Sequence, residues 1–505
     1  MPCGASMKTP KFRAALAAVA LVALAVPAAQ ARDDAPVTEI ELANHIRTLS
    51  GDAFEGRAPG TGGEARAIAY IVGEWAKAGL NPVQGSATPW LQPVPLVETQ
   101  ATGSQAHFKV RGRDFAIEED GVILTGRDAA ASLSDLPAVF VGYGVDGEGR
   151  VNADVRGKLA MMLMGNAPFG DDLPRYRERR QLLADAGASA VLVIATDALP
   201  WAQLRDALGS RTTRLADAKA GPPIGGFLSL EASDALFAKA GEDGATARAA
   251  AAAADFRGLA LPVTADLSAT ATVRSVDSHN IIAKLPGAKP DGKAVLFLGH
   301  WDHLGICAPE GAADRICNGA VDNASGIAVL IAVARRLAKG PRADRDIYFM
   351  ATTAEEKGLL GARWFADHPV LPLTDITVAL NIDTIAVSPR GTPVATIGRG
   401  RPAHDALVRE VASALGRAID DDGEADPFIQ RQDGWALGAK GVPSLMVGGS
   451  FSDMGLLEAF LESDYHGPGD EFSDKVPLGG AAEDADLHVA LGRAFADTKR
   501  WPGTN

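Results

Sequence analysis

The sequence lacks an excess of positive charge. Its 505 residues include 49 lysines and arginines against 63 aspartates and glutamates, which gives a formal net charge of −14. Nucleic-acid-binding proteins usually present a basic surface, so nucleic acid is not an expected partner. The 47% hydrophobic and 22% charged residues exclude disordered and collagen-like proteins, and the length allows a large core and more than one domain.

Long apolar runs are also missing beyond the N-terminus. The run AALAAVALVALAVPAA follows three basic residues and precedes the small-x-small sequence Ala29-Gln30-Ala31, which is typical of a signal-peptide cleavage site. An uncleaved anchor is the alternative, but the run is short and contains Pro27. We therefore predict that residues 1–31 are a signal peptide. The mature protein would then begin at Arg32, have a net charge of −17 and no stable membrane insertion, and be periplasmic or secreted.

Cysteine is scarce as well. Only Cys307 and Cys317 lie beyond the predicted signal peptide. In an oxidising compartment, a pair this close along the chain favours a disulfide that closes a short loop. The two thiols could instead bind zinc, although their spacing matches no zinc-finger pattern.

The order of predicted elements divides the mature chain into three parts. Residues 32–99 contain two segments with apolar residues at helical spacing, and the turn-rich sequence FEGRAPGT lies between them. Residues 100–270 mix short strand-like runs with a helix, and they have no histidine after His107 and no tight cluster of metal-ligand residues. In residues 271–505, strands and helices alternate.

The third part predicts an α/β fold. Nearly continuous apolar strands, such as AVLFLGH, DIYFMATTA and ITVALNI, alternate with helices such as GIAVLIAVARRLAKG. This pattern indicates a mixed, mostly parallel central sheet with helices on both faces. In such sheets, catalytic and binding residues gather just beyond the carboxyl ends of the strands.

Residue types that bind metals stand at these strand ends, at the entrance of the helix after the cysteine pair and in the loop DYHGPGD. Carboxylates and imidazoles without thiolates are the ligand set of a hydrolytic zinc, cobalt or manganese site. Five ligands exceed what one tetrahedral zinc ion takes from protein, and they suit two ions roughly 3.5 to 4 Å apart that share one carboxylate. The five candidates are His300, Asp322, Glu356, Asp383 and His466.

Each of these residues also has an ordinary structural explanation. Asp322 could be an N-cap, Glu355 and Glu356 could complement a helix dipole, and His300 could be a hydrogen-bonded core histidine. These explanations do not account for several independent strand ends that all terminate in ligand-type residues. The pattern as a whole therefore favours a metal site.

Five motifs connect the chain to a known family. The sequences GHWDHLG, GAVDNASG, TTAEEKGLLGARWF, LNIDT and DYHGPGDEF resemble, in this order, the motifs of the M28 di-zinc aminopeptidases. The segment LSGDAFEGRAPGTGGEARAIAYI is similar to the N-terminal part of the same catalytic domain. Residues 100–270 resemble the protease-associated (PA) domain that is inserted in many members. The resemblance implies a phosphorylase/hydrolase-like zinc exopeptidase fold with an inserted α+β domain.

The resemblance also implies a role for each candidate ligand. His300 and Asp383 would hold one metal ion, Glu356 and His466 would hold the other, and Asp322 would bridge both. The implied cofactors are two divalent metal ions, with zinc as the expected metal.

Other residues would act beside the metals. By the resemblance, Glu355 is the general base for a metal-bridged water, Asp302 orients His300, and the peptide bond after Asp322 is cis. His303 is assigned to packing or hydrogen bonding, because Asp302 already fills the orienting role.

The chain departs from the family ahead of its last strand. Members often have a Ser-Asp-His-like stretch there, whereas this chain has Arg431-Gln432-Asp433-Gly434, which puts the substrate-side contacts in doubt. Tyr465 could reach the oxyanion or only pack, and Asp470 could orient His466 or cap a turn.

Together these features predict an exported di-metal aminopeptidase that acts on peptides or small proteins. A carboxypeptidase or a glutaminyl-cyclase-like enzyme on the same fold stays open, and Arg363, Arg399 and Arg401 are candidates to bind a substrate carboxylate. A non-catalytic binding protein is a third possibility, but such a protein is expected to have lost ligands. The sequence does not specify the preferred N-terminal residue or the oligomeric state.

Overall fold

A computed structural model of the chain describes Met1 and residues 35–83, 88–170, 173–196, 201, 204–205 and 211–502. The predicted signal peptide, apart from Met1, lies outside the described residues. Within the described part, no helix is both long and apolar enough to cross a membrane.

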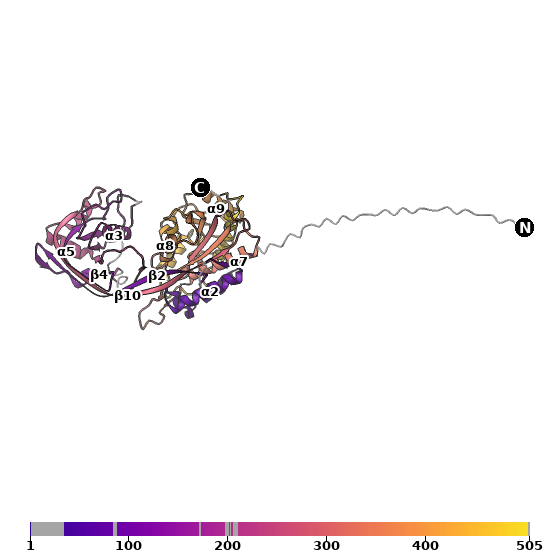
Figure 1. The fold of residues 1–505 in the computed structure, drawn as a ribbon, viewed down its shortest axis with the longest axis horizontal. Coiled ribbons are helices and arrows are strands. Elements are labelled where there is room, and N and C mark those ends of the chain that lie inside the picture. Colours follow the sequence, from indigo (N-terminus) through magenta and orange to yellow (C-terminus); the bar gives the residue numbers. More distant parts are fainter. Residues whose placement is uncertain are drawn as a thin grey trace.

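Two long strands join two lobes of the molecule (Figure 1). β2 (Leu91–Val110) and β10 (Leu259–Leu285) pair antiparallel and run from one lobe into the other. We name the larger part, residues 35–99 and 271–502, the main lobe, and residues 100–270 the insert lobe. The predicted boundaries after residues 99 and 270 fall inside these two strands, because a shared ribbon, not a loop, connects the lobes.

The main lobe contains a mostly parallel sheet, as predicted. Its strand order is β16-β17-β15-β11-β14-β10, and β11 runs parallel to both β14 and β15, while β15 runs parallel to β17. The strands are β11 (Ala294–His300), β14 (Asp346–Thr352), β15 (Ile376–Asn381), β16 (Ala395–Ile397) and β17 (Ser444–Gly448). β1 (Asn81–Pro82) pairs with β10 at the edge of this part.

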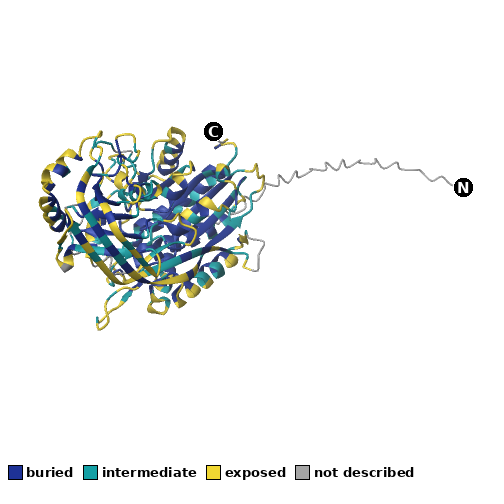
Figure 2. Cartoon of the chain, turned by 60° about the vertical axis from the view of Figure 1, so that its left-hand side comes forward, coloured by how far each residue is buried: buried dark blue, intermediate teal, exposed yellow. Residues whose placement is uncertain are grey.

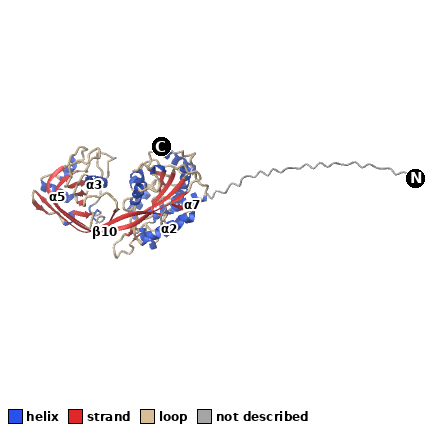
Figure 3. Ribbon diagram, in the orientation of Figure 1, coloured by secondary structure: helices blue, strands red, loops and turns tan. Residues whose placement is uncertain are grey.

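Helices cover both faces of the main sheet (Figure 3). Successive β11 residues alternate between two apolar cores: Val295 and Phe297 lie in one, and Leu296 and Leu298 lie in the other. The first core contains residues of α1 (Glu39–Leu49), α2 (Gly62–Ala78), α7 (Gly326–Lys339), α9 (Pro402–Ala414) and α12 (Leu478–Ala496). The second contains residues of α8 (Leu360–Asp367) and α10 (Gly434–Gly438). The fold therefore matches the predicted α/β class.

The insert lobe has its own strands and helices. β5, β6, β7 and β9 run parallel to one another in this order. At the two ends of this run, β5 pairs antiparallel with β10, and β4 pairs antiparallel with β9. These strands are β4 (Val122–Gly126), β5 (Ala130–Phe140), β6 (Leu159–Leu163), β7 (Ala190–Ile194) and β9 (Ile224–Leu228), with helices α3 (Tyr176–Asp185), α5 (Leu230–Ala240) and α6 (Gly244–Ala250). Buried strands lie at the centre of both lobes, and exposed positions lie on the outer helices (Figure 2).

A small apolar cluster lies where the two lobes meet. β3 (Arg113–Phe115) pairs with the part of β2 that lies in the insert lobe, whereas β8 (Thr212–Leu215), also of the insert lobe, pairs with the part of β2 that lies in the main lobe. Leu215 of β8 packs with Leu360 and Trp364 of α8 in the main lobe. The same cluster includes Ala354, next to Glu355, so the insert lobe contacts the main lobe close to the predicted site.

Candidate metal centre and active site

Three neighbouring parallel strands end at one edge of the main sheet, and their ends carry predicted site residues. His300 is the last residue of β11, and it pairs in register with Thr352, the last residue of β14. Glu355 follows β14 after two intervening residues, and Asp383 follows β15 after one. The sheet thus brings together residues that lie more than 80 positions apart in the sequence.

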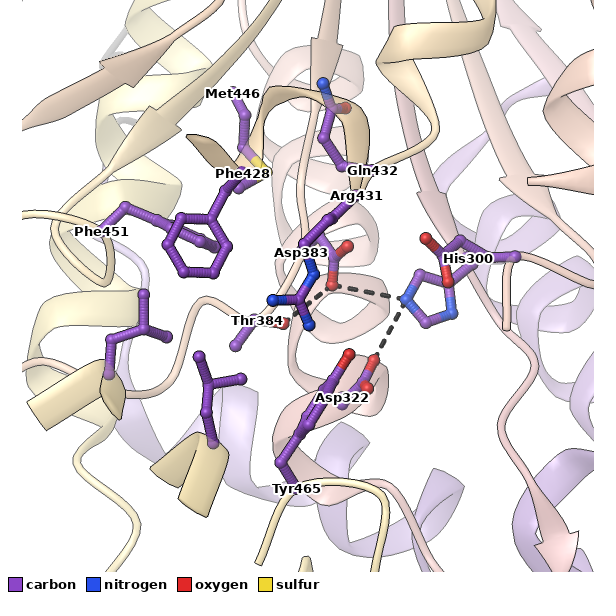
Figure 4. A pocket seen from close by; sticks show the side chains of 13 residues that line it. His300, Asp322, Asp383, Thr384, Phe428, Arg431, Gln432, Met446, Phe451 and Tyr465 are labelled. Carbon is purple, nitrogen blue, oxygen red and sulfur yellow. Dashed lines mark hydrogen bonds and ion pairs between the residues drawn. The ribbon is translucent and has the colours of Figure 1, made fainter. Parts of the chain in front are cut away.

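A first group of candidate ligands surrounds His300 (Figure 4). Its Nε2 atom lies 3.2 Å from Oδ1 of Asp322 and 3.4 Å from Oδ1 of Asp383. All three side chains are buried, and one ligand atom from each lies within 4.8 Å of the others. An ion can therefore be held among these atoms.

Asp302 supports this group mainly through its backbone. Nδ1 of His300 lies 3.0 Å from the carbonyl oxygen of Asp302, whereas the Asp302 carboxylate is 3.9 Å away. The carboxylate instead accepts a hydrogen bond from the backbone N–H of Glu355 at 3.1 Å. Asp302 thus contacts both the candidate ligand and the candidate base, although the contact to His300 is not the side-chain contact that the resemblance implies.

A second group lies on the other side of Asp322. Nε2 of His466 is 2.9 Å from Oε2 of Glu356 and 3.3 Å from Oδ2 of Asp322. Asp322 therefore directs one carboxylate oxygen to His300 and the other to His466. This geometry is what a carboxylate shared between two ions requires.

His303 also belongs to this second group. Its Nδ1 atom lies 2.6 Å from Oε1 of Glu356, and His303, Asp322 and Glu356 form a possible metal-binding group. The ring is fully buried, and apart from this short contact neither its two nitrogens nor Oε1 of Glu356 has a hydrogen-bond partner among the described residues. Buried polar atoms without partners are costly, and a bound cation would satisfy those of this cluster. The sequence predicts only packing or hydrogen bonding for His303. No pattern in the sequence predicts its contact with Glu356.

The loop that carries Asp322 is held from two sides. The carboxylate of Asp470 accepts hydrogen bonds from the backbone N–H groups of Val321 at 2.8 Å and Asp322 at 3.0 Å. The side chain of Asn323 donates to the carbonyl oxygen of Ile382 at 3.1 Å, next to Asp383. The Asp322–Asn323 peptide bond is cis, as the resemblance implies. Asp470 therefore positions the candidate bridging residue through its backbone N–H group.

Arg57 is a buried cation that joins three loops of the site. Its guanidinium group donates to the carbonyl oxygens of Leu49, Trp301, Asn318 and Gly319 at 2.7 to 2.9 Å. Trp301 directly follows His300, and Asn318 and Gly319 shortly precede Asp322 along the chain. Burial lowers the pKa of Arg57 to about 10, and the charges of Asp470 and Asp322 act in the opposite direction. The sequence places Arg57 in the turn-rich loop FEGRAPGT and does not predict its role at the site. The arginine within this loop is the one signal of that role.

Burial and crowding of carboxylates shift the pKa values in this cluster. Burial raises the pKa of Glu355 well above its usual range, and the charges of Asp433 and Glu356 raise it further. Burial would also raise the pKa of Glu356, but the close contacts of its carboxylate with the imidazole rings of His303 and His466 lower this pKa to about 2. Two neighbouring carboxylates thus differ in proton affinity: Glu355 can hold a proton, whereas Glu356 stays ionised.

The predicted disulfide between Cys307 and Cys317 is present. It links the two short strands β12 (Gly305–Ile306) and β13 (Ile316–Cys317), which lie between His300 and Asp322 along the chain. The Sγ atom of Cys317 is 3.5 Å from the carbonyl oxygen of His466. The disulfide therefore restrains a loop that contacts the backbone of His466, one of the candidate ligands.

A pocket opens onto the first group of ligands. His300, Asp322 and Asp383 lie on one side, and the apolar side chains of Phe428, Met446 and Phe451 lie on another (Figure 4). Glu355, Leu457 and Leu461 also line this pocket. Tyr465 also lines the pocket, and its ring stacks on His466 with 3.7 Å between ring centroids. Burial raises the pKa of Tyr465, so its hydroxyl stays protonated and can donate a hydrogen bond.

The stretch that departs from the family contributes to the same pocket. Arg431 and Gln432 line it, and Asp433 is buried and accepts a hydrogen bond from the Thr352 hydroxyl at the end of β14. Burial raises the pKa of Asp433 to about 6. Arg363, Arg399 and Arg401 are not among the residues that line the pocket.

The segment that carries this cluster of His, Asp and Glu residues matches a known family. The model of peptidase family M28 matches residues 280–487, the segment that contains both groups of candidate ligands. This segment, 208 of the 505 residues, is therefore similar to peptidase family M28. Aminopeptidase YwaD of Bacillus subtilis is 26% identical to the chain over 278 residues, which are 55% of this chain and 49% of that protein. Across its curated relatives, the chain spans only 11% to 58% of their length.

Solved structures of M28-like enzymes have the same fold. The aminopeptidase from Aneurinibacillus sp. strain AM-1 has a TM-score of 0.56 and 20% identity, and the match covers 92% of this chain and 95% of that one. BSAP, a zinc aminopeptidase from Bacillus subtilis, has a TM-score of 0.50 and 19% identity, with coverage of 92% and 97%. At these identities the comparison establishes the fold alone. The matched length includes the insert lobe.

Proposed function

We propose that this protein is an exported di-metal aminopeptidase that releases N-terminal residues from peptides or small proteins. The observation that carries the proposal is the pair of ligand groups that share Asp322, with Glu355 beside them. The names of the relatives, which are aminopeptidases, support the direction of cleavage.

The donor set fits two divalent ions, and zinc is the metal named for one structural neighbour. We assign His300 and Asp383 to one ion, Glu356 and His466 to the other, and Asp322 to both. His303 then positions Glu356 through the contact between Nδ1 of His303 and Oε1 of Glu356. When bound, the ions would lower the pKa of water and polarise the scissile carbonyl.

The chain itself supplies the proton transfers. Glu355 lies at the end of β14 with its backbone fixed by Asp302, and its raised pKa suits a group that takes a proton from water and then gives it to the leaving amine. Tyr465 is a neutral hydroxyl in the pocket that can donate to the oxygen of the scissile carbonyl.

Export and the role of the insert lobe belong to the same proposal. The signal-peptide pattern of residues 1–31 and the Cys307–Cys317 disulfide support a periplasmic or secreted protein, because disulfides persist in oxidising compartments. We assign residues 100–270 to a PA-like domain on the resemblance given above. A carboxypeptidase or a glutaminyl-cyclase-like enzyme is the alternative on this fold.

Blocked peptides test the direction of cleavage. The zinc-reconstituted mature protein is incubated with a tetrapeptide that is free at both ends, with its N-acetylated form and with its C-amidated form, and products are read by mass spectrometry. We expect cleavage of the free and amidated peptides at the first bond and no cleavage of the acetylated peptide. Cleavage of the acetylated peptide with loss of its C-terminal residue would instead establish a carboxypeptidase.

A further inference from the structure

Arg431 is a cation in the pocket that has no acidic partner within the described part of the chain. Its side chain is exposed and lines the pocket with His300 and Asp383. Among the residues that the structure describes, no carboxylate or carbonyl bonds its guanidinium group. Its contacts are with two aromatic rings: Cζ lies 5.3 Å from the centroid of Phe428 and 5.9 Å from that of Tyr465.

Other arginines that precede Arg431 in this part of the chain do have acidic partners. Arg399 lies 3.1 Å from Asp426, Arg409 lies 2.8 Å from Asp421, and Arg417 lies 3.0 Å from Asp484. Asp426, which is five residues before Arg431 along the chain, is thus engaged by another arginine.

The aromatic contacts leave the hydrogen-bonding edge of Arg431 available. A guanidinium group stacks through its flat faces, while its N–H donors point outward in its plane. Figure 4 shows the group extending into the pocket between the Phe428 ring and the cluster of His300, Asp322 and Asp383. Such a planar fork matches a carboxylate, which can accept two parallel hydrogen bonds.

We propose that Arg431 forms a carboxylate-binding subsite of this pocket, so that the enzyme prefers substrates with a negative charge close to the scissile bond. This inference rests on the proposed aminopeptidase function. The carboxylate has two possible sources: the side chain of an N-terminal glutamate or aspartate, or the C-terminal carboxylate of a dipeptide. In both cases Arg431 would offset the repulsion that Asp322, Glu355 and Asp383 exert on an anionic substrate.

Four peptides separate these sources. Leu-Leu and Leu-Leu-NH2 differ only in the C-terminal carboxylate, and Glu-Leu-NH2 and Gln-Leu-NH2 differ only in the side-chain carboxylate. For the zinc-loaded wild type we expect one of the two pairs to show a kcat/KM ratio of about 10 to 100 in favour of the anion, the usual worth of a hydrogen bond to a charged group. The pair that shows this ratio identifies the source.

Two variants assign the preference to Arg431. In Arg431→Gln the ratio should fall to about 1, while kcat/KM for the uncharged member of the pair should stay within about threefold of the wild type. Arg409→Gln removes the same charge from a surface salt bridge outside the pocket and should keep the wild-type ratio. Arg431→Lys should keep part of it, because the charge remains but the fork is lost.

The outcomes distinguish the two proposals. Similar rates for both members of each pair in the wild type, or a ratio that persists in Arg431→Gln, would overturn the subsite and leave the aminopeptidase assignment intact. No hydrolysis of any of the four peptides by the zinc-loaded wild type would overturn both.

Discussion

The main lobe and the insert lobe both contain parallel strands that are buried on both faces, but the residues at their strand ends differ. In the main lobe, β11 ends in His300, and Glu355 and Asp383 follow the neighbouring strands. In the insert lobe, β6 is followed by Met164 and β7 by Ala195, both buried and apolar. A parallel sheet offers an edge where residues can meet, and the side chains at that edge decide whether chemistry is possible there.

The two lobes also share a structural device, a buried arginine that binds backbone carbonyls. Arg57 does so in the main lobe, and Arg179 donates to the carbonyl oxygens of Tyr143 and Gly165 in the insert lobe. Burial lowers the pKa of each arginine to about 10. Arg57 lies next to the carboxylates of the candidate site, whereas Arg179 packs on Tyr143. The same interaction can thus serve a site in one lobe and packing alone in the other.

The largest difference between the lobes should appear when a carboxylate is neutralised in each. Glu355→Gln should lower kcat by about 10²- to 10⁴-fold, because the amide cannot accept the proton from water, while zinc content stays the same. Glu178→Gln in the insert lobe, where the side chain accepts from the backbone of Arg175, should leave kcat within about twofold. Steady-state kinetics with parallel zinc analysis checks both, and unchanged turnover in Glu355→Gln would refute its role as the base.

The arginine pair provides the next largest effect. Arg57→Gln and Arg179→Gln should each lower the free energy of unfolding by about 2 to 5 kcal/mol, because buried carbonyls lose their donors. Only Arg57→Gln should also weaken zinc retention, since its partners flank His300 and Asp322. Denaturant unfolding and zinc content after dialysis measure the two effects. Equal zinc loss in Arg179→Gln would show that general destabilisation, not the position of Arg57, controls metal binding.

The smallest expected effect concerns pH. His488 is buried in the main lobe, and burial lowers its pKa to about 4, below its ordinary value of 6.5. The folded state keeps this histidine neutral, so its contribution to stability is complete above pH 6.5 and is lost as the pH falls toward 4. The loss amounts to about 3 kcal/mol.

A difference measurement isolates this histidine. Burial raises the pKa of Asp484 to about 6, which makes stability change in the opposite direction over part of the same range. The free energy of unfolding is therefore compared between the wild type and His488→Gln from pH 7 to pH 4, and the gap should shift in favour of the variant. A constant gap between wild type and His488→Gln would refute the assignment.

Much of the site could be predicted from the sequence because parallel strands end at one edge. This rule alone places His300, Glu355 and Asp383 close together. The mostly parallel sheet also follows from apolar strands that alternate with helices. The residues themselves also pointed to Asp322 in GAVDNASG as a candidate ligand, and the family resemblance added its bridging role.

Other features depend on contacts between distant segments and could not be predicted. The buried guanidinium group of Arg57 donates to carbonyl oxygens that lie more than 240 positions away along the chain. Nothing in FEGRAPGT predicts these contacts. The contact of His303 with Glu356 depends on how two loops fold against each other. The predicted lobe boundaries fall inside β2 and β10 because the alternation of residues along a strand does not show where it leaves one core and enters another.

The zinc content of the mature protein tests the central claim most directly. After zinc reconstitution and removal of free metal, mass spectrometry of the wild type should find two zinc ions per chain. Asp322→Asn, which removes the carboxylate shared by both groups, should retain fewer than one, and Asp146→Asn, which removes a carboxylate bonded to Arg150 in the insert lobe, should retain two. One ion or none in the wild type, or two ions in Asp322→Asn, would contradict the account.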